Sequence, residues 1–219
     1  MDAVVAGIKN SSLLNNGQAC IAHTRILVHR SIYNTVVEGL ADLVRRLNVG
    51  NPTDPGTDIG PLVRKSQQDR VLGYIRTGIE EGVRLIAGGP EPLEDPSLAA
   101  GFYVQPTLFA DVRNDMTIAQ EEIFGPVLAV IPFDTDTEAV EIANDSEYGL
   151  SGGVWSTDPA RALHVARQIR TGLIHINGAP RHGDAPFGGF KNSGMGREYG
   201  PAGLAAFTET KSIAIGHRH

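Results

Sequence analysis

The chain contains a single cysteine, Cys20, and its surroundings suit a nucleophile. It closes the motif Asn15-Asn16-Gly17-Gln18-Ala19-Cys20, which stands between an apolar helical pattern and the apolar residues 26–28. Because Asn-Gly is a strong turn signal, we expect the thiol to lie near the end of a helix and before a strand, where a side chain can reach a cleft. The alternative is a buried cysteine that acts as a small hydrophobe. A single thiol becomes a catalytic candidate only with partners elsewhere in the fold.

Two acids and an aromatic ring directly precede the most apolar run of the chain. Glu121, Glu122 and Phe124 lead through Gly-Pro into residues 127–131. A carboxylate held beside such a turn can accept two hydrogen bonds from a diol, while a nearby ring offers a flat face to a heteroaromatic ligand. The alternative is a solvated acidic turn in which Phe124 plugs the core.

Residues 186–198 form a glycine-rich segment in which the backbone must bend sharply or approach another segment closely. Gly194-Met195-Gly196 is similar to the start of a dinucleotide-binding loop. However, Tyr199 occupies the place of the third glycine, and no buried strand precedes the segment, which argues against a phosphate loop. We expect instead a structured loop that lines a cleft.

The histidines show no spacing typical of zinc ligands, which disfavours metal catalysis. His164 lies in a helical pattern, and His175 in an apolar strand is more often a core side chain than a base. His182 could meet a substrate from a loop, but none of the three is assigned a catalytic role. A cysteine–histidine hydrolase stays open because nucleophile and base need only be neighbours in space.

Composition favours a folded globular protein and narrows its partners. The 219 residues, 41% hydrophobic and 20% charged, suffice for one large domain or two small ones. A net charge of −6 without a long basic stretch argues against nucleic acid as a partner. No apolar run approaches the roughly 20 residues that span a membrane. The N-terminus lacks a secretion-signal pattern, and together with the unpaired cysteine this points to the cytoplasm.

Helical and extended patterns alternate along the chain, which predicts an α/β fold. Residues 127–131 are continuously apolar, as in a parallel strand that is buried on both faces. Ser31 is expected to cap the first long helix, and Ile32 and Ile79 are among the residues expected to face inward. The other expected strands lie at residues 83–87, 152–155, 173–176 and 210–215, and the expected helices at 31–47, 71–79, 137–144 and 159–169.

Taken in order, three motifs resemble the NAD(P)-dependent aldehyde dehydrogenase superfamily. The first is Asn16-Gly17-Gln18-Ala19-Cys20, and the second is Glu121-Glu122-Ile123-Phe124-Gly125-Pro126. The third is Pro186-Phe187-Gly188-Gly189-Phe190-Lys191, followed in the sequence by residues 193–198. The likeness covers only the C-terminal, catalytic part of that family's chain. It implies a three-layer α/β sandwich with a mostly parallel central sheet over residues 1–215, followed by a tail at residues 216–219.

Site roles follow from this resemblance position by position. Cys20 matches the family's thiolate nucleophile, and its backbone N–H matches one donor of the oxyanion hole. Glu122 matches the carboxylate that binds the ribose hydroxyls on the nicotinamide side, and Phe124 matches the ring that flanks that end of the cofactor. Gln67 matches a residue near the same ribose, and Phe187 one near the substrate entrance. No metal is implied.

The family's dinucleotide-binding half, general-base glutamate and second oxyanion donor, an asparagine, normally precede this segment. The expectation is therefore a truncated domain. The parent protein, a homo-oligomer that uses NAD or NADP, would oxidise an aldehyde to a carboxylic acid through a thiohemiacetal and a thioester. This chain alone would bind no cofactor and be inactive as a dehydrogenase. The aldehyde is not fixed by the sequence, although residues 179–184 are expected to line the entrance.

Two other functions stay open. The chain could be a non-catalytic assembly or binding domain whose strand at residues 210–215 pairs with a neighbour's sheet. It could also be a thiol esterase that forms an acyl-enzyme without nicotinamide. Replacing Cys20 by serine separates these, because assembly would survive and thiol chemistry would not.

Overall fold

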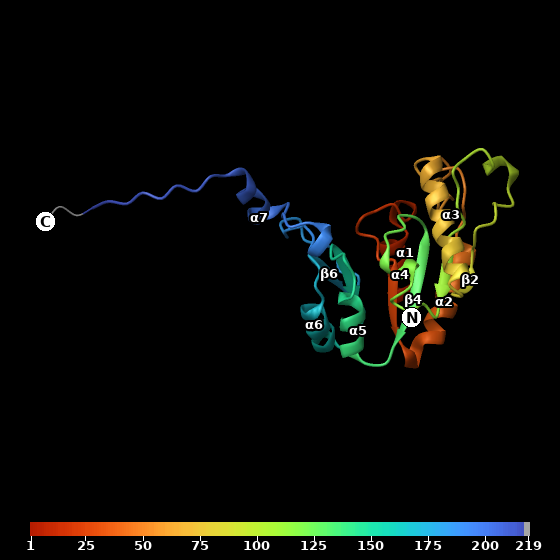
Figure 1. Cartoon of the computed structure of the whole chain (residues 1–219), viewed down its shortest axis with the longest axis horizontal. Helices are drawn as coiled ribbons and strands as arrows, with labels where there is room; N and C mark the ends of the chain where they lie inside the picture. The colour runs from red at the N-terminus through yellow and green to blue at the C-terminus, as the bar shows by residue number, and fades with distance from the viewer. Residues whose placement is uncertain (217–219) are drawn as a thin grey trace.

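The computed structural model describes residues 1–216, in which helices and strands alternate as predicted (Figure 1). Two of the expected strands, at residues 83–87 and 152–155, occur with one-residue shifts. The α-helices are α1 (Asp2–Ser12), α2 (Tyr33–Arg46), α3 (Lys65–Glu80), α4 (Thr117–Gln120), α5 (Asp136–Asn144), α6 (Pro159–Gln168) and α7 (Gly200–Leu204). The strands are β1 (Arg25–His29), β2 (Arg84–Ala87), β3 (Thr107–Ala110), β4 (Val127–Phe133), β5 (Ser151–Val154) and β6 (Leu173–Ile176).

The larger sheet has four strands in the order β1-β4-β3-β2. Strands β1 and β3 both run parallel to β4, whereas β2 runs antiparallel to β3 at the edge. Residues 127–131 of the central strand β4 are all buried, as their continuous apolar run predicted. The sheet is therefore mostly parallel, as the resemblance implies.

Alternate residues of β4 belong to cores on opposite faces of this sheet. Leu128 and Val130 pack with residues of α1 and α2, whereas Val127, Ala129 and Ile131 pack with residues of α3 and α4. Since successive side chains of a strand point to opposite faces, one strand can support both cores. Helices, sheet and helices thus form the expected three layers.

Strands β5 and β6 form a separate parallel pair that packs with α6 and lies beside the larger sheet (Figure 1). The ring of Trp155, directly after β5, lies so close to Gly7 of α1 that a Cβ at Gly7 would overlap it. A second tie comes from Arg25 of β1, which donates to the carbonyl oxygens of Ile142 and Ala143 at 3.0 Å each. The contact at Trp155 thus docks the smaller sheet on the larger body, and the Arg25 bonds tie the end of α5 to β1.

After α7 and a short 3-10 turn (Ala205–Phe207), residues 208–216 have no regular secondary structure and extend away from the body (Figure 1). Ile213 and Ile215 are exposed. The strand predicted at residues 210–215 is therefore wrong for the single chain. An extended segment becomes a strand only when its N–H and C=O groups pair with a neighbouring strand, and no described residue pairs with this one. Of the predicted tail, residues 217–219 lie outside the described residues.

The start of α2 differs from the prediction. The helix begins at Tyr33 without a side-chain cap, and Ser31 lies instead in a short 3-10 turn, where its N–H donates to the ring of His29. Ile32 therefore precedes the buried stripe and is 48% exposed.

The inward face of α3 also differs at one position. The buried stripe of this helix runs through Val71, Ile75 and Gly78. Ile79 lies one position further around the helix and is 41% exposed, so its predicted inward orientation is wrong.

Candidate active site

Cys20 lies on an exposed turn between α1 and β1, where the sequence predicted it. Residues 15–17 take positive φ angles of 51°, 60° and 74°, a region that asparagine and glycine tolerate better than other residues. The N–H of Ala22 then donates to the carbonyl oxygen of Ala19 at 2.9 Å, which places Cys20 within a tight turn. The alternative of a buried core cysteine is excluded.

Polar side chains of the same motif fix this turn to the segment before α3. The amide of Asn16 accepts from the N–H of Gly60 at 2.8 Å and donates to the carbonyl oxygen of Pro61 at 3.1 Å. The side-chain oxygen of Gln18 accepts from the N–H of Val63 at 3.0 Å. These three bonds give the asparagine and the glutamine of the motif a structural role beside the thiol.

The turn that carries Cys20 meets the turn that carries Glu122 at two glycines. A Cβ on Gly17 would overlap the carbonyl group of Gly125, so the two backbones are in direct contact. Glycine is needed here both for this close approach and for its φ of 74°. Two motifs about a hundred residues apart in the sequence are thereby brought together.

Side chains of α3 hold the Glu122 turn from one side. The amide nitrogen of Gln67 donates to the carbonyl oxygens of Ile123 and Phe124 at 3.2 and 2.9 Å. Arg70, one helical turn further along, donates to the carbonyl oxygen of Glu122 at 2.6 Å. The carbonyl groups of three consecutive residues are thus fixed by one face of one helix.

The side chains of this turn have different surroundings. Ile123 is 4% exposed and fills the core, whereas Phe124 is only half-buried and takes a positive φ of 61°. The carboxylate of Glu121 accepts from the hydroxyl of Tyr74 at 2.6 Å. Burial and this bond raise the pKa of Tyr74. The carboxylate of Glu122 is exposed and has no hydrogen-bond or ion-pair partner within residues 1–216. Because Ile123 plugs the core, Phe124 is available for another role.

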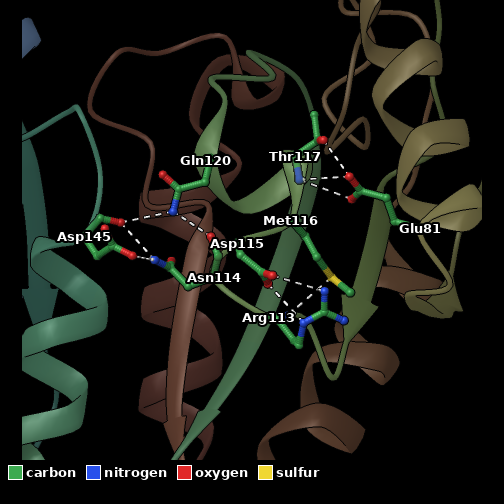
Figure 2. A network of polar contacts seen from close by, with 8 residues as sticks. All are labelled: Glu81, Arg113, Asn114, Asp115, Met116, Thr117, Gln120 and Asp145. Atoms are coloured by element: carbon green, nitrogen blue, oxygen red, sulfur yellow. Dashed lines mark hydrogen bonds and ion pairs between the residues drawn. The ribbon is translucent and has the colours of Figure 1, made fainter.

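The short helix α4, which ends one residue before Glu121, is anchored at both ends (Figure 2). At its start, the hydroxyl of Thr117 donates to the carboxylate of Glu81 at 2.6 Å, and its N–H donates there at 3.2 Å. At its end, the amide of Gln120 donates to the carbonyl oxygens of Asn114 and Asp145 at 2.6 and 3.1 Å. This network fixes the base from which the Glu122 turn projects.

The glycine-rich segment forms a tight loop beside β6. Phe187 and Glu198 exchange backbone hydrogen bonds at 2.9 and 2.7 Å, which closes residues 187–198 into one structured loop. A Cβ on Gly172, directly before β6, would overlap the carbonyl group of Gly188. The expectation of closely approaching backbones is therefore correct at Gly188. Phe187 itself is half-buried.

Lys191 of this segment caps a helix. Its ammonium group donates to the carbonyl oxygens of Asn144 and Ser146 at 2.6 and 2.8 Å, at the C-terminal end of α5. Burial lowers the pKa of Lys191, and the charges of Arg170 and Arg25 lower it further. A cation suits this position because the C-terminus of a helix carries partial negative charge.

The structure therefore brings Cys20, Gln67, Glu122 and Phe124 into one pair of touching turns and their supporting helix. Phe187 lies apart from them in sequence, on the loop beside β6. Sequence reasoning missed Arg70, although its place three residues after Gln67 puts both on one face of α3.

A family model described as the aldehyde dehydrogenase family matches residues 1–213. The chain belongs to this family. Among curated relatives, a geranial dehydrogenase of Castellaniella defragrans is 48% identical over 215 residues. A putative aldehyde dehydrogenase of Staphylococcus saprophyticus is 45% identical over 214 residues. Each comparison covers 98% of this chain.

Solved structures of the family have the same fold as this chain. A Mycobacterium tuberculosis aldehyde dehydrogenase complexed with NAD+ is 51% identical, with a TM-score of 0.93, over 98% of this chain and 44% of the other. An NAD+ complex of an aldehyde dehydrogenase from Bacillus cereus is 43% identical, with a TM-score of 0.90, over 97% of this chain and 42% of the other.

The comparisons cover nearly all of this chain but less than half of each relative. The chain spans 44% of the Castellaniella relative and 45% of the Staphylococcus saprophyticus relative. More than half of each relative therefore lies outside the region of similarity. Residues 1–216 contain no helix long and apolar enough to cross a membrane.

Proposed function

We propose that residues 1–215 are the catalytic portion of an NAD(P)-dependent aldehyde dehydrogenase that converts an aldehyde to a carboxylic acid. Membership of the family supports this reaction class. The observation that carries the proposal is the backbone contact between Gly17 and Gly125. It joins a turn with an exposed thiol to a turn with an unpaired carboxylate, which is how a nucleophile and a cofactor site would need to be arranged.

Cys20 is the nucleophile in this proposal. Its sulfur forms a bond to the aldehyde carbon while the carbonyl π electrons move onto oxygen. The backbone N–H of Cys20, which donates to no group within residues 1–216, would stabilise that oxyanion. Loss of one such donor typically lowers turnover by about 100-fold to 1000-fold. Water later cleaves the C–S bond of the thioester, which releases the acid and restores the thiol.

Glu122 and Phe124 would hold the cofactor at the nicotinamide end. An exposed carboxylate without a protein partner can accept two hydrogen bonds from ribose hydroxyls, and a half-buried ring can cover a heteroaromatic face. Gln67 would contribute its amide oxygen, because its nitrogen already binds two carbonyl groups. The bound nicotinamide supplies the acceptor for the hydride that leaves the aldehyde carbon. NAD+ is the dinucleotide in the two solved relatives described above.

The 219-residue chain by itself is proposed not to turn over, and to bind no dinucleotide. The resemblance assigns the general base, the dinucleotide-binding half and the second oxyanion donor to the portion of the relatives that this chain does not span. A thiol that lacks a base to activate it reacts slowly. Phe187 is proposed to lie near the substrate entrance, with residues 179–184 beside it.

A chimera tests the proposal. This chain would replace the matching 44% of the Mycobacterium tuberculosis relative, whose fold it shares at a TM-score of 0.93. We expect the chimera to reduce NAD+ in the presence of an aldehyde such as octanal. Cys20→Ser should lower its turnover by more than about 1000-fold. Glu122→Gln should raise the KM for NAD+.

The controls are the isolated 219-residue chain, which should form no reduced nicotinamide, and Glu94→Gln in the exposed loop before β3, which should leave the chimera unchanged. A folded chimera that is inactive, or one whose activity survives Cys20→Ser, would overturn the proposed role of Cys20. Turnover by the isolated chain would overturn its proposed inactivity.

A second candidate function is self-assembly through the C-terminal segment. Residues 208–216 are exposed and extended, with Ile213 79% and Ile215 84% exposed, as in a strand that lacks a partner. The parent protein is accordingly proposed to be a homo-oligomer. Removal of residues 209–219 should then lower the sedimentation coefficient, whereas Cys20→Ser should not change it. A monomeric full chain would contradict assembly.

A further inference from the structure

His23, three residues after Cys20, is held by its backbone to the end of α1. Its N–H donates to the carbonyl oxygen of Ser11 at 3.2 Å, and its own carbonyl oxygen accepts from the hydroxyl of Ser12. Ser12 is completely buried, so this anchor lies inside the protein. His23, which follows the turn that carries Cys20, is therefore fixed to the larger body.

The ring of His23 reaches the smaller sheet. Its Nε2 lies 2.9 Å from the hydroxyl oxygen of Ser151 on β5. A Cβ on Gly153 of the same strand would lie 3.5 Å from the ring, which is ordinary contact distance. The ring centroid lies 5.9 Å from that of His175 on β6, with 50° between the planes. His23 thus contacts both strands of the smaller sheet and α1 at once.

The surroundings of this ring favour its neutral form. Burial, and secondly the nearby His175, lower the pKa of His23 to about 4. His175 is the titratable group that faces it from β6, and the contacts from α1 and β5 are serines and a glycine without charge. A neutral imidazole keeps one donor and one acceptor nitrogen, so the bond to Ser151 stays available at neutral pH.

We propose that His23 is a positioning residue for Cys20, which locks the thiol turn onto β5 through Ser151. The inference deepens the proposed function and rests on it, since a position for Cys20 matters only if the thiol reacts. His23 acts through the backbone: the turn closed by Ala19 and Ala22 stands directly before it. The smaller sheet, whose β6 contacts the glycine-rich loop, would thereby set where the nucleophile stands.

Fluorine NMR on the full 219-residue chain tests this. Cys20 is the only cysteine, so a trifluoromethyl thiol reagent gives one labelled site. We expect a single resonance at neutral pH whose position changes with a midpoint near pH 4, as His23 takes up a proton. Acidic side chains titrate in the same range, and His23→Gln separates them, because glutamine can still donate to Ser151 but does not titrate.

Four variants define the outcomes. His23→Gln should keep the neutral-pH resonance and lose the acid transition. His23→Ala and the milder Ser151→Ala should both shift that resonance at neutral pH toward the value of labelled free cysteine. His164→Ala, at an exposed position on α6, should behave as wild type.

Resonances of His23→Ala and Ser151→Ala that superimpose on the wild-type resonance would overturn the positioning role, as would an acid transition that survives in His23→Gln. These readouts need no turnover. An inactive chimera together with a resonance that shifts in His23→Ala and Ser151→Ala would therefore refute the proposed function alone. An active chimera together with a resonance that these variants leave unchanged would refute the positioning role alone.

Discussion

Glu121 and Glu122 are neighbours in the sequence, yet within residues 1–216 only one of the two carboxylates has a hydrogen-bond partner. Tyr74 donates to the carboxylate of Glu121, whereas Arg70 binds the backbone oxygen of Glu122 and leaves its carboxylate free. Arg70 thus orients Glu122 through its backbone and does not neutralise its charge. The residue that stays unpaired is also the one that the family resemblance assigns to a ribose.

The lowered pKa of His23 predicts a pH-dependent stability. The unfolded chain protonates this residue near pH 6.5, whereas the folded chain resists protonation until about pH 4. Stability should therefore be unaffected above pH 6.5 and fall as the pH drops from there toward 4. Between about pH 7.5 and about pH 5 the loss from this group is on the order of 2 kcal/mol.

Urea unfolding at these two pH values measures the loss of stability. His23→Gln removes the titrating group and should show a smaller loss than wild type by that amount. His164→Gln, at an exposed position, should keep the full loss. Equal losses in wild type and His23→Gln would show that other groups govern the acid sensitivity.

At the scale of elements, the candidate site consists of two turns that side-chain hydrogen bonds hold in place. The Cys20 turn is fixed by Asn16 and Gln18, and the Glu122 turn by Gln67 and Arg70 of α3. Gly17 is where the two turns touch. The geometry of the site therefore depends on a position that carries no side chain.

Gly17→Ala should separate the two turns and destabilise the chain. The added methyl group would overlap the Gly125 carbonyl, and alanine disfavours the φ of 74°. The positive φ alone costs roughly 1–2 kcal/mol, so we expect a loss above about 2 kcal/mol in urea unfolding. Gly73→Ala is the matched control, because a Cβ there meets nothing within 4 Å on α3. It should stabilise the helix by about 0.5–1 kcal/mol. Changes of the same sign in both variants would contradict this account.

The sequence predicted the elements whose patterns are local. The continuous apolar run identified β4, and helical periodicity identified α2 and α3. Strand β3 was not predicted, although all four of its residues are buried. The terminal strand was wrong because pairing depends on a partner that local sequence does not encode.

For the candidate site, the motifs pointed to the proposed residues but not to the side chains that hold them in place. Arg70 lies 52 residues from the carbonyl group it binds, and His23 lies 128 residues from Ser151. Contacts of this separation follow from the packing of layers, which periodicity and turn signals do not describe. The proposed roles of all five candidate residues stay predictions: Cys20, Gln67, Glu122, Phe124 and Phe187.

At the scale of the whole molecule, the chain consists of a three-layer body and a smaller sheet that is docked against it (Figure 1). The docking uses Trp155 against Gly7 and His23 against Ser151. Since these contacts lie before and after Cys20 in the sequence, movement of the smaller sheet would change the position of Cys20.

Trp155 is the only tryptophan and reports this docking directly. In wild type we expect urea transitions followed by tryptophan fluorescence and by far-ultraviolet circular dichroism to coincide. Gly7→Val would push the indole ring away from α1, so its fluorescence transition should move to lower urea than its dichroism transition. Gly73→Val is the control for a bulkier residue in a helix, and its two transitions should stay together. Coincident transitions in Gly7→Val would show that the smaller sheet does not depend on this contact.

The exposure of Cys20 also has a consequence for handling the chain. Without a reductant, air oxidation would join two copies by a disulfide between their thiols, because no second cysteine is present to form one within a chain. Such a covalent dimer would be blocked at Cys20 and could be mistaken for a native assembly on a sizing column. Dithiothreitol would dissociate the covalent dimer and leave a dimer held by the C-terminal segment intact.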